Sequence, residues 1–199
     1  LCETYRQCGP TSNTEEKKKR EVLNNLTKLV ISNRSDLKVN IKFKKFGLSP
    51  DDIQQMKNYG ILPDKRTLKS LSKAYNSSNP NIEDIIELQD KLDFKIDTDY
   101  VDFLLKNNGG IPSKVRIKGN KIVIDHFLSF KSDYKLNSII DIYSDFQQYG
   151  LPIANTSSGD SIILSSDGKV RFFNHNIFSI DEEVGVIANN FLELLEKLY

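Results

Sequence analysis

The chain has 199 residues, of which 38% are hydrophobic and 28% charged, and its net charge is +1. This composition favours one domain with a hydrophobic core, alone or with an appendage, and excludes a largely disordered chain. No apolar run approaches the roughly 20 residues of a membrane-spanning helix, and the first residues lack the pattern of a signal peptide. Because the chain begins at Leu1 rather than Met, we expect it to be part of a longer protein.

The first part of the chain predicts a small basic α/β segment. Glu15 to Ser32 carries an apolar stripe at helical spacing, so a helix is expected there. Residues 37–44 alternate apolar and basic side chains, which predicts a half-buried strand with a basic outer face. Ser49 before Pro50 marks the start of a short helix. Thr67 to Tyr75 is either another short helix or an extended arm.

Residues 76–80 form a polar linker that ends in a proline, and the predicted domain boundary lies there. Residues 1–76 then form a basic N-terminal extension, with 16 Lys and Arg against 8 Asp and Glu. Residues 77–199 have the opposite balance, with 12 Lys and Arg against 19 Asp and Glu. The reversal indicates either two segments with different partners or ordinary variation in surface charge.

The second part of the chain predicts helices that flank a hairpin. Asn81 caps a first helix, and a second helix runs from about Thr98 to Asn107 before two glycines. Apolar residues on both sides of Gly119-Asn120 predict a tight β-hairpin. Asn137 is expected to cap a third helix.

Strands dominate the predictions for the remaining residues. Leu151 to Ala154 predicts a short strand at a sheet edge, because Pro152 cannot donate to a ladder. Strands at Ser161 to Ser165 and Lys169 to Asn174 pair through a tight turn. A closing helix is expected from Asp181 to Leu198. Tight turns pair strands antiparallel, so the expected fold class is α+β, an antiparallel sheet covered by helices.

Three stretches carry a resemblance to a known family. They are IIELQDKLDFKIDTDYVDFLLKNNGGIPSK (Ile85 to Lys114), YGLPIANTSSGDSIILSSDGKVRFFNHN (Tyr149 to Asn176) and IANNFLELLEKL (Ile187 to Leu198). In this order they resemble the opening helices, the second signature and the closing helix of the SUKH superfamily, which includes the yeast Smi/Knr cell-wall regulators. The resemblance covers residues 81–199, about 60% of the chain.

The sequence departs from the family pattern at several positions. Ile96-Asp97 stands where Leu-Pro is usual, and Gln89 where Glu is common. Phe173 stands where Trp is frequent, and Asn174 where Asp is frequent. These changes keep the apolar volumes but alter the polar pattern, so no particular interface contact is carried over.

The resemblance implies function by binding. Bacterial members look like immunity proteins that occlude or distort a cognate toxin, whereas yeast members act as regulators and scaffolds. The family motif carries no catalytic residues and no cofactor, so the resemblance implies a protein that is not an enzyme and needs no cofactor. The expected partner is a basic toxin protein, with a nuclease as one candidate, and neither a membrane nor nucleic acid is an expected partner.

The basic extension has a second resemblance. Lys42 to Lys65 is similar to the stretch that precedes the histidine-rich core of some HNH-type toxin nucleases. Such a core needs closely spaced histidines to hold a metal ion, and no histidine follows before His126. The extension is therefore either a toxin remnant without its active site or an unrelated basic segment.

Few residues suggest metal or redox chemistry. Cys2 and Cys8 are the two cysteines, which suits a reducing compartment, and we expect a cytoplasmic protein. The other soft ligands, His126 and His175, lie far apart in the sequence, so no metal site is expected.

Two histidines have polar neighbours that suggest chemistry. His175 follows Asn174 and could meet Asp160, while His126 follows Asp125. No serine or cysteine nucleophile can be assigned beside either histidine from the sequence, which favours structural roles and no catalytic residue. Asp160 itself follows a glycine and suits a turn.

Acidic residues crowd the first two helices of the predicted domain. They could form a surface for a basic partner, or they could be a solvated helix face favoured by the helix dipole. Together with the turn residue, the tentative partner-binding residues are Asp90, Asp93, Asp97, Asp99, Asp102 and Asp160.

Overall fold

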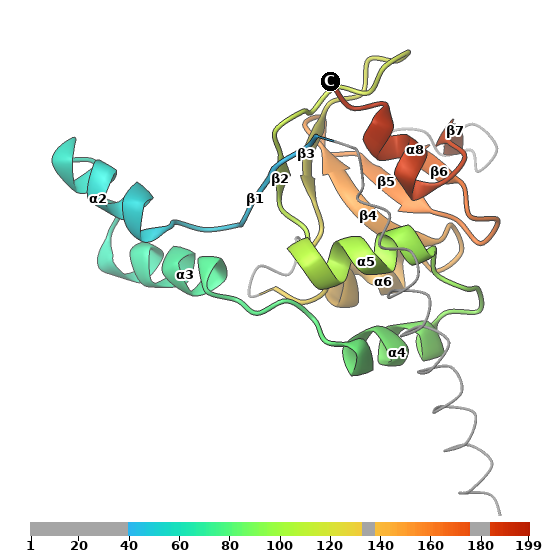
Figure 1. Cartoon of the computed structure of the whole chain (residues 1–199), viewed down its shortest axis with the longest axis horizontal. Coiled ribbons are helices and arrows are strands. Elements are labelled where there is room, and N and C mark those ends of the chain that lie inside the picture. Colours follow the sequence, from blue (N-terminus) through green and yellow to red (C-terminus); the bar gives the residue numbers. More distant parts are fainter. Residues whose placement is uncertain (1–39, 133–137, 176–183) are drawn as a thin grey trace, which may run out of the picture. The chain divides into compact units, whose positions relative to one another are not determined.

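The computed structural model describes residues 40–132, 138–175 and 184–199 (Figure 1). These residues lie in one compact unit that runs from Lys38 to Tyr199. The helix predicted over Glu15 to Ser32, the start of the strand predicted over 37–44 and the cap predicted at Asn137 lie outside the described residues.

An antiparallel sheet of five strands forms the centre of this unit, with neighbouring strands in chain order. Its strands are β3 (Ile124–Phe127), β4 (Leu151–Thr156), β5 (Ser161–Leu164), β6 (Val170–Phe173) and β7 (Val184–Ala188). The helices that accompany it are α4 (Ile82–Lys91), α5 (Thr98–Asn107), α6 (Ile139–Phe146) and α8 (Phe191–Glu196) (Figure 1). The α+β fold class with an antiparallel sheet is thereby confirmed.

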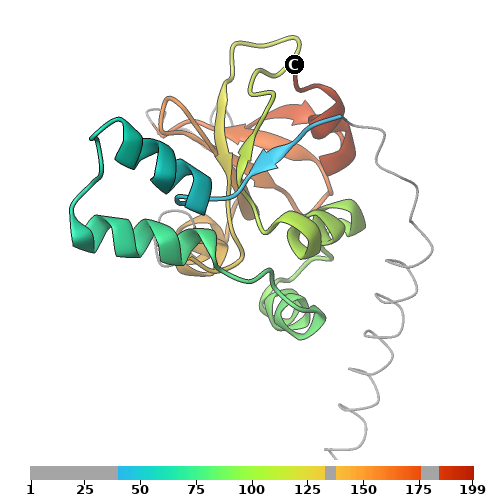
Figure 2. The ribbon, with the colours of Figure 1, turned by 60° about the vertical axis from the view of Figure 1, so that its left-hand side comes forward.

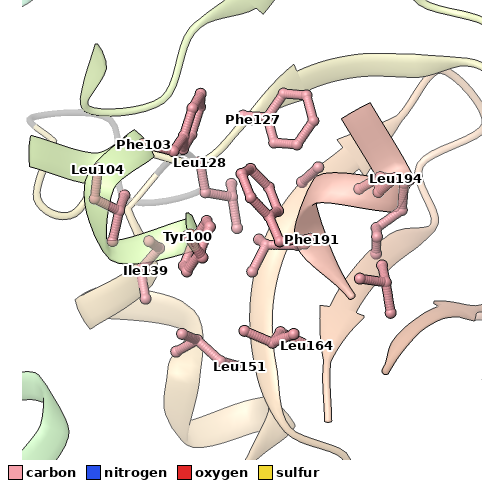
Figure 3. Close-up of a cluster of buried hydrophobic side chains, with 14 of the residues drawn as sticks. Tyr100, Phe103, Leu104, Phe127, Leu128, Ile139, Leu151, Leu164, Phe191 and Leu194 are labelled. Atoms are coloured by element: carbon pink, nitrogen blue, oxygen red, sulfur yellow. The ribbon is translucent and has the colours of Figure 1, made fainter. Parts of the chain in front are cut away.

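The core lies where helices α5, α6 and α8 meet the sheet (Figure 3). Its centre is an aromatic cluster in which the Phe103 ring lies 5.3 Å from that of Phe127 and 5.2 Å from that of Phe191. The ring of Tyr100 stacks on Phe103 at 6.1 Å. All four side chains are almost fully buried, so this cluster joins two helices to a strand.

Local sequence signals start the helices as predicted. The Asn81 side chain accepts a hydrogen bond from the Asp84 backbone N–H, and the Asp84 carboxylate accepts one from the Asn81 N–H. Such a capping box satisfies two backbone donors at the start of α4. The same arrangement links Ser49 and Asp52 at the start of α2 (Pro50–Asn58).

The turn after α5 is built from Asn108 and the two glycines behind it. Asn108 adopts a left-handed conformation with φ of 50°, and its side-chain oxygen accepts a hydrogen bond from the Phe130 N–H at 2.8 Å. A Cβ on Gly109 would lie 2.5 Å from the Leu128 carbonyl oxygen, so only glycine fits this close approach. The predicted stop of the helix is confirmed.

The predicted hairpin around Gly119-Asn120 is also present, although its two arms share one isolated bridge, between Arg116 and Val123, rather than a long ladder. Ile117 donates from its backbone to the Ile122 carbonyl at 3.2 Å, and Ile124 donates to Val115 at 2.7 Å.

Within residues 40–75, two helices and a short strand precede the linker. Residues 67–75, for which a helix and an arm were both open, belong to helix α3 (Lys65–Tyr75). Figure 2 shows α2 and α3 side by side, joined by a turn, and α2 contains no buried residue. The predicted strand is short among the described residues, where β1 spans Phe43–Lys44 and pairs with β2 (Ile111–Pro112).

The prediction of one closing helix from Asp181 to Leu198 is wrong. Residues 184–188 form strand β7, which pairs with β6, and helix α8 starts only at Phe191. The apolar spacing fits a helix, but the β-branched residues Val and Ile favour a strand once β6 offers a partner. Asn190 then marks the true start, because its side chain accepts from the Glu193 N–H.

The prediction that β4 lies at a sheet edge is also wrong, because β4 pairs with β3 on one side and β5 on the other. The register against β5 shifts between Pro152 and Ala154. A bulge of this kind accommodates the missing proline N–H inside a sheet.

Candidate partner-binding surface

Helices α4 and α5 present a concentration of negative charge. Residues 81–102 contain eight Asp and Glu but only two Lys. The helices turn Ile85, Leu88 and Tyr100 into the core, which leaves the charged positions outside. We call the following residues, of which Asp93 lies in the loop between the two helices, the acidic helix face: Glu83, Glu87, Asp90, Asp93, Asp99 and Asp102.

The carboxylates of this face differ in how far the fold already uses them. Asp90 and Asp93 are exposed, and neither forms an ion pair or hydrogen bond within the described ranges. Asp102 accepts from Lys106 at 2.6 Å, and Glu87 accepts from Lys91 at 2.9 Å, both one helical turn along. Such exposed pairs contribute little stability, so a partner's cation can replace the lysine at low cost.

Asp99 is the carboxylate of the acidic helix face whose ionised form is disfavoured by its surroundings. Partial burial raises the pKa of the Asp99 carboxyl, and the neighbouring carboxylates of Asp97 and Asp102 raise this pKa further. A raised carboxyl pKa means that the fold disfavours the ionised form. A positive group placed beside Asp99 would relieve this repulsion.

Two of the six tentative contact residues already serve the fold. Asp97 caps α5 through the Asp99 N–H at 2.8 Å and accepts from the Phe191 N–H of α8 at 3.3 Å. Asp160 is buried and accepts from the Ser158 hydroxyl at 2.5 Å and the His175 N–H at 3.2 Å. Both carboxylates therefore hold parts of the chain together, and the acidic helix face omits them.

The two histidines lie in different surroundings. His126 is buried, with Nδ1 2.7 Å from an Asp125 carboxylate oxygen and Nε2 3.4 Å from the Asn155 side-chain nitrogen. His175 is exposed, and its Nδ1 lies 3.7 Å from Asp160. The Ser158 hydroxyl donates to Asp160 rather than to His175. These contacts suit histidines that order a strand and a turn.

The linker borders a hollow of about 470 Å³ that sequence reasoning missed. Its polar lining includes Asn79 and Asn108, whose side-chain amides donate to backbone carbonyls of Leu105 and Ser78. These hydrogen bonds hold the linker against the end of α5, so we interpret the hollow as a result of linker packing. No sequence pattern marks it, since its lining comes from distant segments.

In the part of the chain that the structure describes, no group of three or more His, Cys, Asp or Glu side chains is placed to hold a metal ion. No helix formed by those same residues is long and apolar enough to cross a membrane.

These features define an α+β domain in which helices and an antiparallel sheet share one core and two helices carry an acidic face. Residues 79–197 match the SMI1 / KNR4 family (SUKH-1), and the chain belongs to this family. The resemblance noted in the sequence is thereby confirmed. The family includes immunity proteins and Knr4-type regulators.

The chain is similar to the SPbeta prophage-derived uncharacterized protein YokK of Bacillus subtilis (strain 168). The two are 30% identical over 148 residues, which cover 62% of this chain and 77% of the relative. No solved structure matches the chain.

Proposed function

We propose that the chain is a non-catalytic immunity protein that neutralises a bacterial toxin by direct protein–protein binding. The observation that carries this proposal is the acidic helix face on a domain of the SUKH-1 family. Asp90 and Asp93 form no ion pair within the described residues, so they are free to meet a partner.

Charge complementarity favours a basic toxin. A surface of one sign speeds the encounter with a partner of the opposite sign and disfavours wrong partners. Toxins that act on nucleic acid are commonly basic, because they must bind phosphates. The raised pKa of Asp99 supports the same choice, since a cation brought by the toxin would stabilise the ionised carboxylate.

The test uses the full chain and a toxin that it captures, identified by mass spectrometry and purified. We expect one equivalent of the chain to inhibit the toxin's activity. A variant with Asp90→Lys, Asp93→Lys and Asp99→Lys should inhibit far less. The matched control, Asp141→Lys, Asp145→Lys and Glu196→Lys, makes the same charge change at exposed positions on α6 and α8 and should inhibit like the wild type.

Two outcomes count against the proposal. If the captured toxin stays active with excess chain bound, the chain does not act as an immunity protein. If both variants inhibit equally, the acidic helix face is not the contact surface. A captured partner without toxic activity would favour the other function in the family, a Knr4-type regulator.

A further inference from the structure

Helices α2 and α3 carry a positive surface. Residues 57–75 contain four Lys and one Arg but only one Asp. That acid, Asp64, caps α3, because its carboxylate accepts hydrogen bonds from the backbone N–H groups of Arg66 and Thr67. The cations of this stretch therefore outnumber the acids without any second carboxylate nearby in the sequence.

The cations of these two helices lie close together. Lys65 and Lys69 are one helical turn apart on α3, and Arg66 lies beside them, so three exposed cations share one side of this helix. Lys57 is exposed near the end of α2, which a short turn joins to the start of α3 (Figure 2). We call these four residues the basic helix pair: Lys57, Lys65, Arg66 and Lys69.

The fold does not use the side chains of the basic helix pair. Within residues 40–132, 138–175 and 184–199, none of the four side chains forms an ion pair or a hydrogen bond. By contrast, Lys44 on the preceding strand pairs with Asp52 at 3.3 Å. Because α2 buries no residue and α3 buries only Ala74, both helices keep most of their surface available to a partner.

A surface of the opposite charge lies on the same chain. The acidic helix face belongs to residues 81–102, which contain eight Asp and Glu against two Lys. As far as the structure describes the chain, no ion pair joins this face to the basic helix pair. One molecule therefore exposes two complementary surfaces at the same time.

The charge of the whole chain permits contact between copies. The net charge is only +1, so two copies repel each other weakly over long distances. At short range, the positive surface of one copy attracts the negative surface of another.

We propose that the basic helix pair of one copy docks on the acidic helix face of a second copy. The contact is head-to-tail, so copies either close into a ring, of which a dimer is the smallest, or extend in a row. A basic toxin would compete with the second copy for the acidic helix face. This inference goes beyond the proposed function, because it needs no toxin and gives helices α2 and α3 a partner.

Sedimentation velocity of the full chain over a range of concentrations tests the proposal. We expect the wild type to self-associate at low salt and to dissociate at high salt, because salt screens exposed charges. Neutralising the basic helix pair should weaken self-association about tenfold. The variant carries Lys57→Gln, Arg66→Gln and Lys69→Gln, and its matched control carries Lys114→Gln, Lys118→Gln and Lys121→Gln. The control neutralises three exposed lysines around the Gly119-Asn120 hairpin and should associate like the wild type.

A second variant neutralises the other surface with Asp90→Asn, Asp93→Asn and Asp99→Asn. It should lose self-association to the same extent. Each of the two variants keeps the surface that the other lacks, so a mixture should form a one-to-one complex although neither variant associates alone. This rescue separates a specific contact from a general effect of net charge.

Several results would overturn the proposal. They are a wild type that stays monomeric at low salt, self-association that neither variant weakens, and a mixture of the variants that stays monomeric. Self-association that disappears when copurified nucleic acid is digested would assign the basic helix pair to nucleic acid instead. A monomeric wild type would leave the proposed function standing, since toxin inhibition is measured separately.

Discussion

At the residue scale, Phe103 is the centre of the aromatic cluster in the core. Its ring meets those of Phe43, Tyr100, Phe127 and Phe191, which come from four different elements. Phe103→Ala should lower the free energy of unfolding by about 3–5 kcal/mol. Urea denaturation measures this loss.

Tyr59→Ala is the control for this prediction, because its side chain is 78% exposed. It should change the free energy of unfolding by less than about 0.5 kcal/mol. Similar losses in the two variants would show that the aromatic cluster does not hold the fold.

At Tyr100 we predict a substitution that raises the free energy of unfolding. Its hydroxyl is buried without a hydrogen-bond partner among the described residues, and burial raises the pKa of this phenol. Tyr100→Phe keeps the ring and removes the unsatisfied group, so it should stabilise the fold by up to about 1 kcal/mol. A loss of stability in urea denaturation would mean that the hydroxyl has a partner in solution.

Asp167 predicts a dependence of stability on pH. Two hydrogen bonds from Arg171, at 2.8 and 2.9 Å, hold the pKa of this carboxyl at about 2, below its usual 3.8. A lowered carboxyl pKa stabilises the fold above pH 4, and the contribution fades as pH falls towards 2. Because the pair is partly exposed, Asp167→Asn should cost only about 0.5 kcal/mol at pH 7.

Urea denaturation of wild type and Asp167→Asn at pH 7 and pH 2 measures this effect. The asparagine retains an oxygen for the Lys169 N–H, so the variant tests the charge. A difference that persists unchanged at pH 2 would contradict the assignment to the ionised carboxylate.

At the element scale, the two capping boxes have unequal consequences. Asn81→Ala removes the cap of α4, which buries Ile85 and Leu88, and should cost the whole domain about 1 kcal/mol. Ser49→Ala removes the same kind of cap from α2, which buries no residue. It should fray α2 without lowering the global free energy of unfolding.

Native-state hydrogen exchange together with urea denaturation separates these outcomes. Faster exchange confined to α2 in Ser49→Ala is expected. An equal global loss from both variants would mean that α2 unfolds with the core.

The sequence predicts elements best where the signal is local. Caps at Ser49 and Asn81 and the glycines after α5 are short-range chemistry, and the structure confirms them. The predictions for β7 and β4 were wrong because strand pairing decides the structure of β7 and the position of β4 in the sheet. The Val and Ile residues of β7 have helical spacing, yet β7 pairs with β6 as a strand. The place of β4 between β3 and β5 also depends on pairing, which the sequence of β4 alone does not show.

In the candidate site, too, local features could be predicted from the sequence and tertiary contacts could not. The clustering of acids on α4 and α5 is visible in the sequence, because helical spacing decides which side chains face outward. That Asp97 and Asp160 serve internal hydrogen bonds is not visible, since their partners Phe191 and His175 come from other elements. The alternation over residues 37–44 indicates that Phe43 lies on the half-buried side of a strand, but its contacts with Phe103 and Phe127 depend on tertiary packing.

At the scale of the whole molecule, the compact unit Lys38–Tyr199 extends beyond the family match. The Phe43 side chain packs against the core although it precedes the linker at residues 76–80. The boundary at this linker and the origin of the extension as a toxin remnant stay predictions. Cleavage of nucleic acid by the full chain with a divalent metal ion would favour a nuclease, and we expect none.

The account depends most on the claim that the acidic helix face binds a basic partner. Calorimetry at low and high salt tests this claim directly by measuring the affinity for the captured partner. Three proteins are compared: the wild type, the variant with Lys at Asp90, Asp93 and Asp99, and the control with Lys at Asp141, Asp145 and Glu196. We predict that salt weakens wild-type binding and that the acidic-face variant binds about thirtyfold more weakly, about 2 kcal/mol, with a flatter salt dependence. The control should follow the wild type. An acidic-face variant with unchanged affinity and salt dependence would contradict the claim.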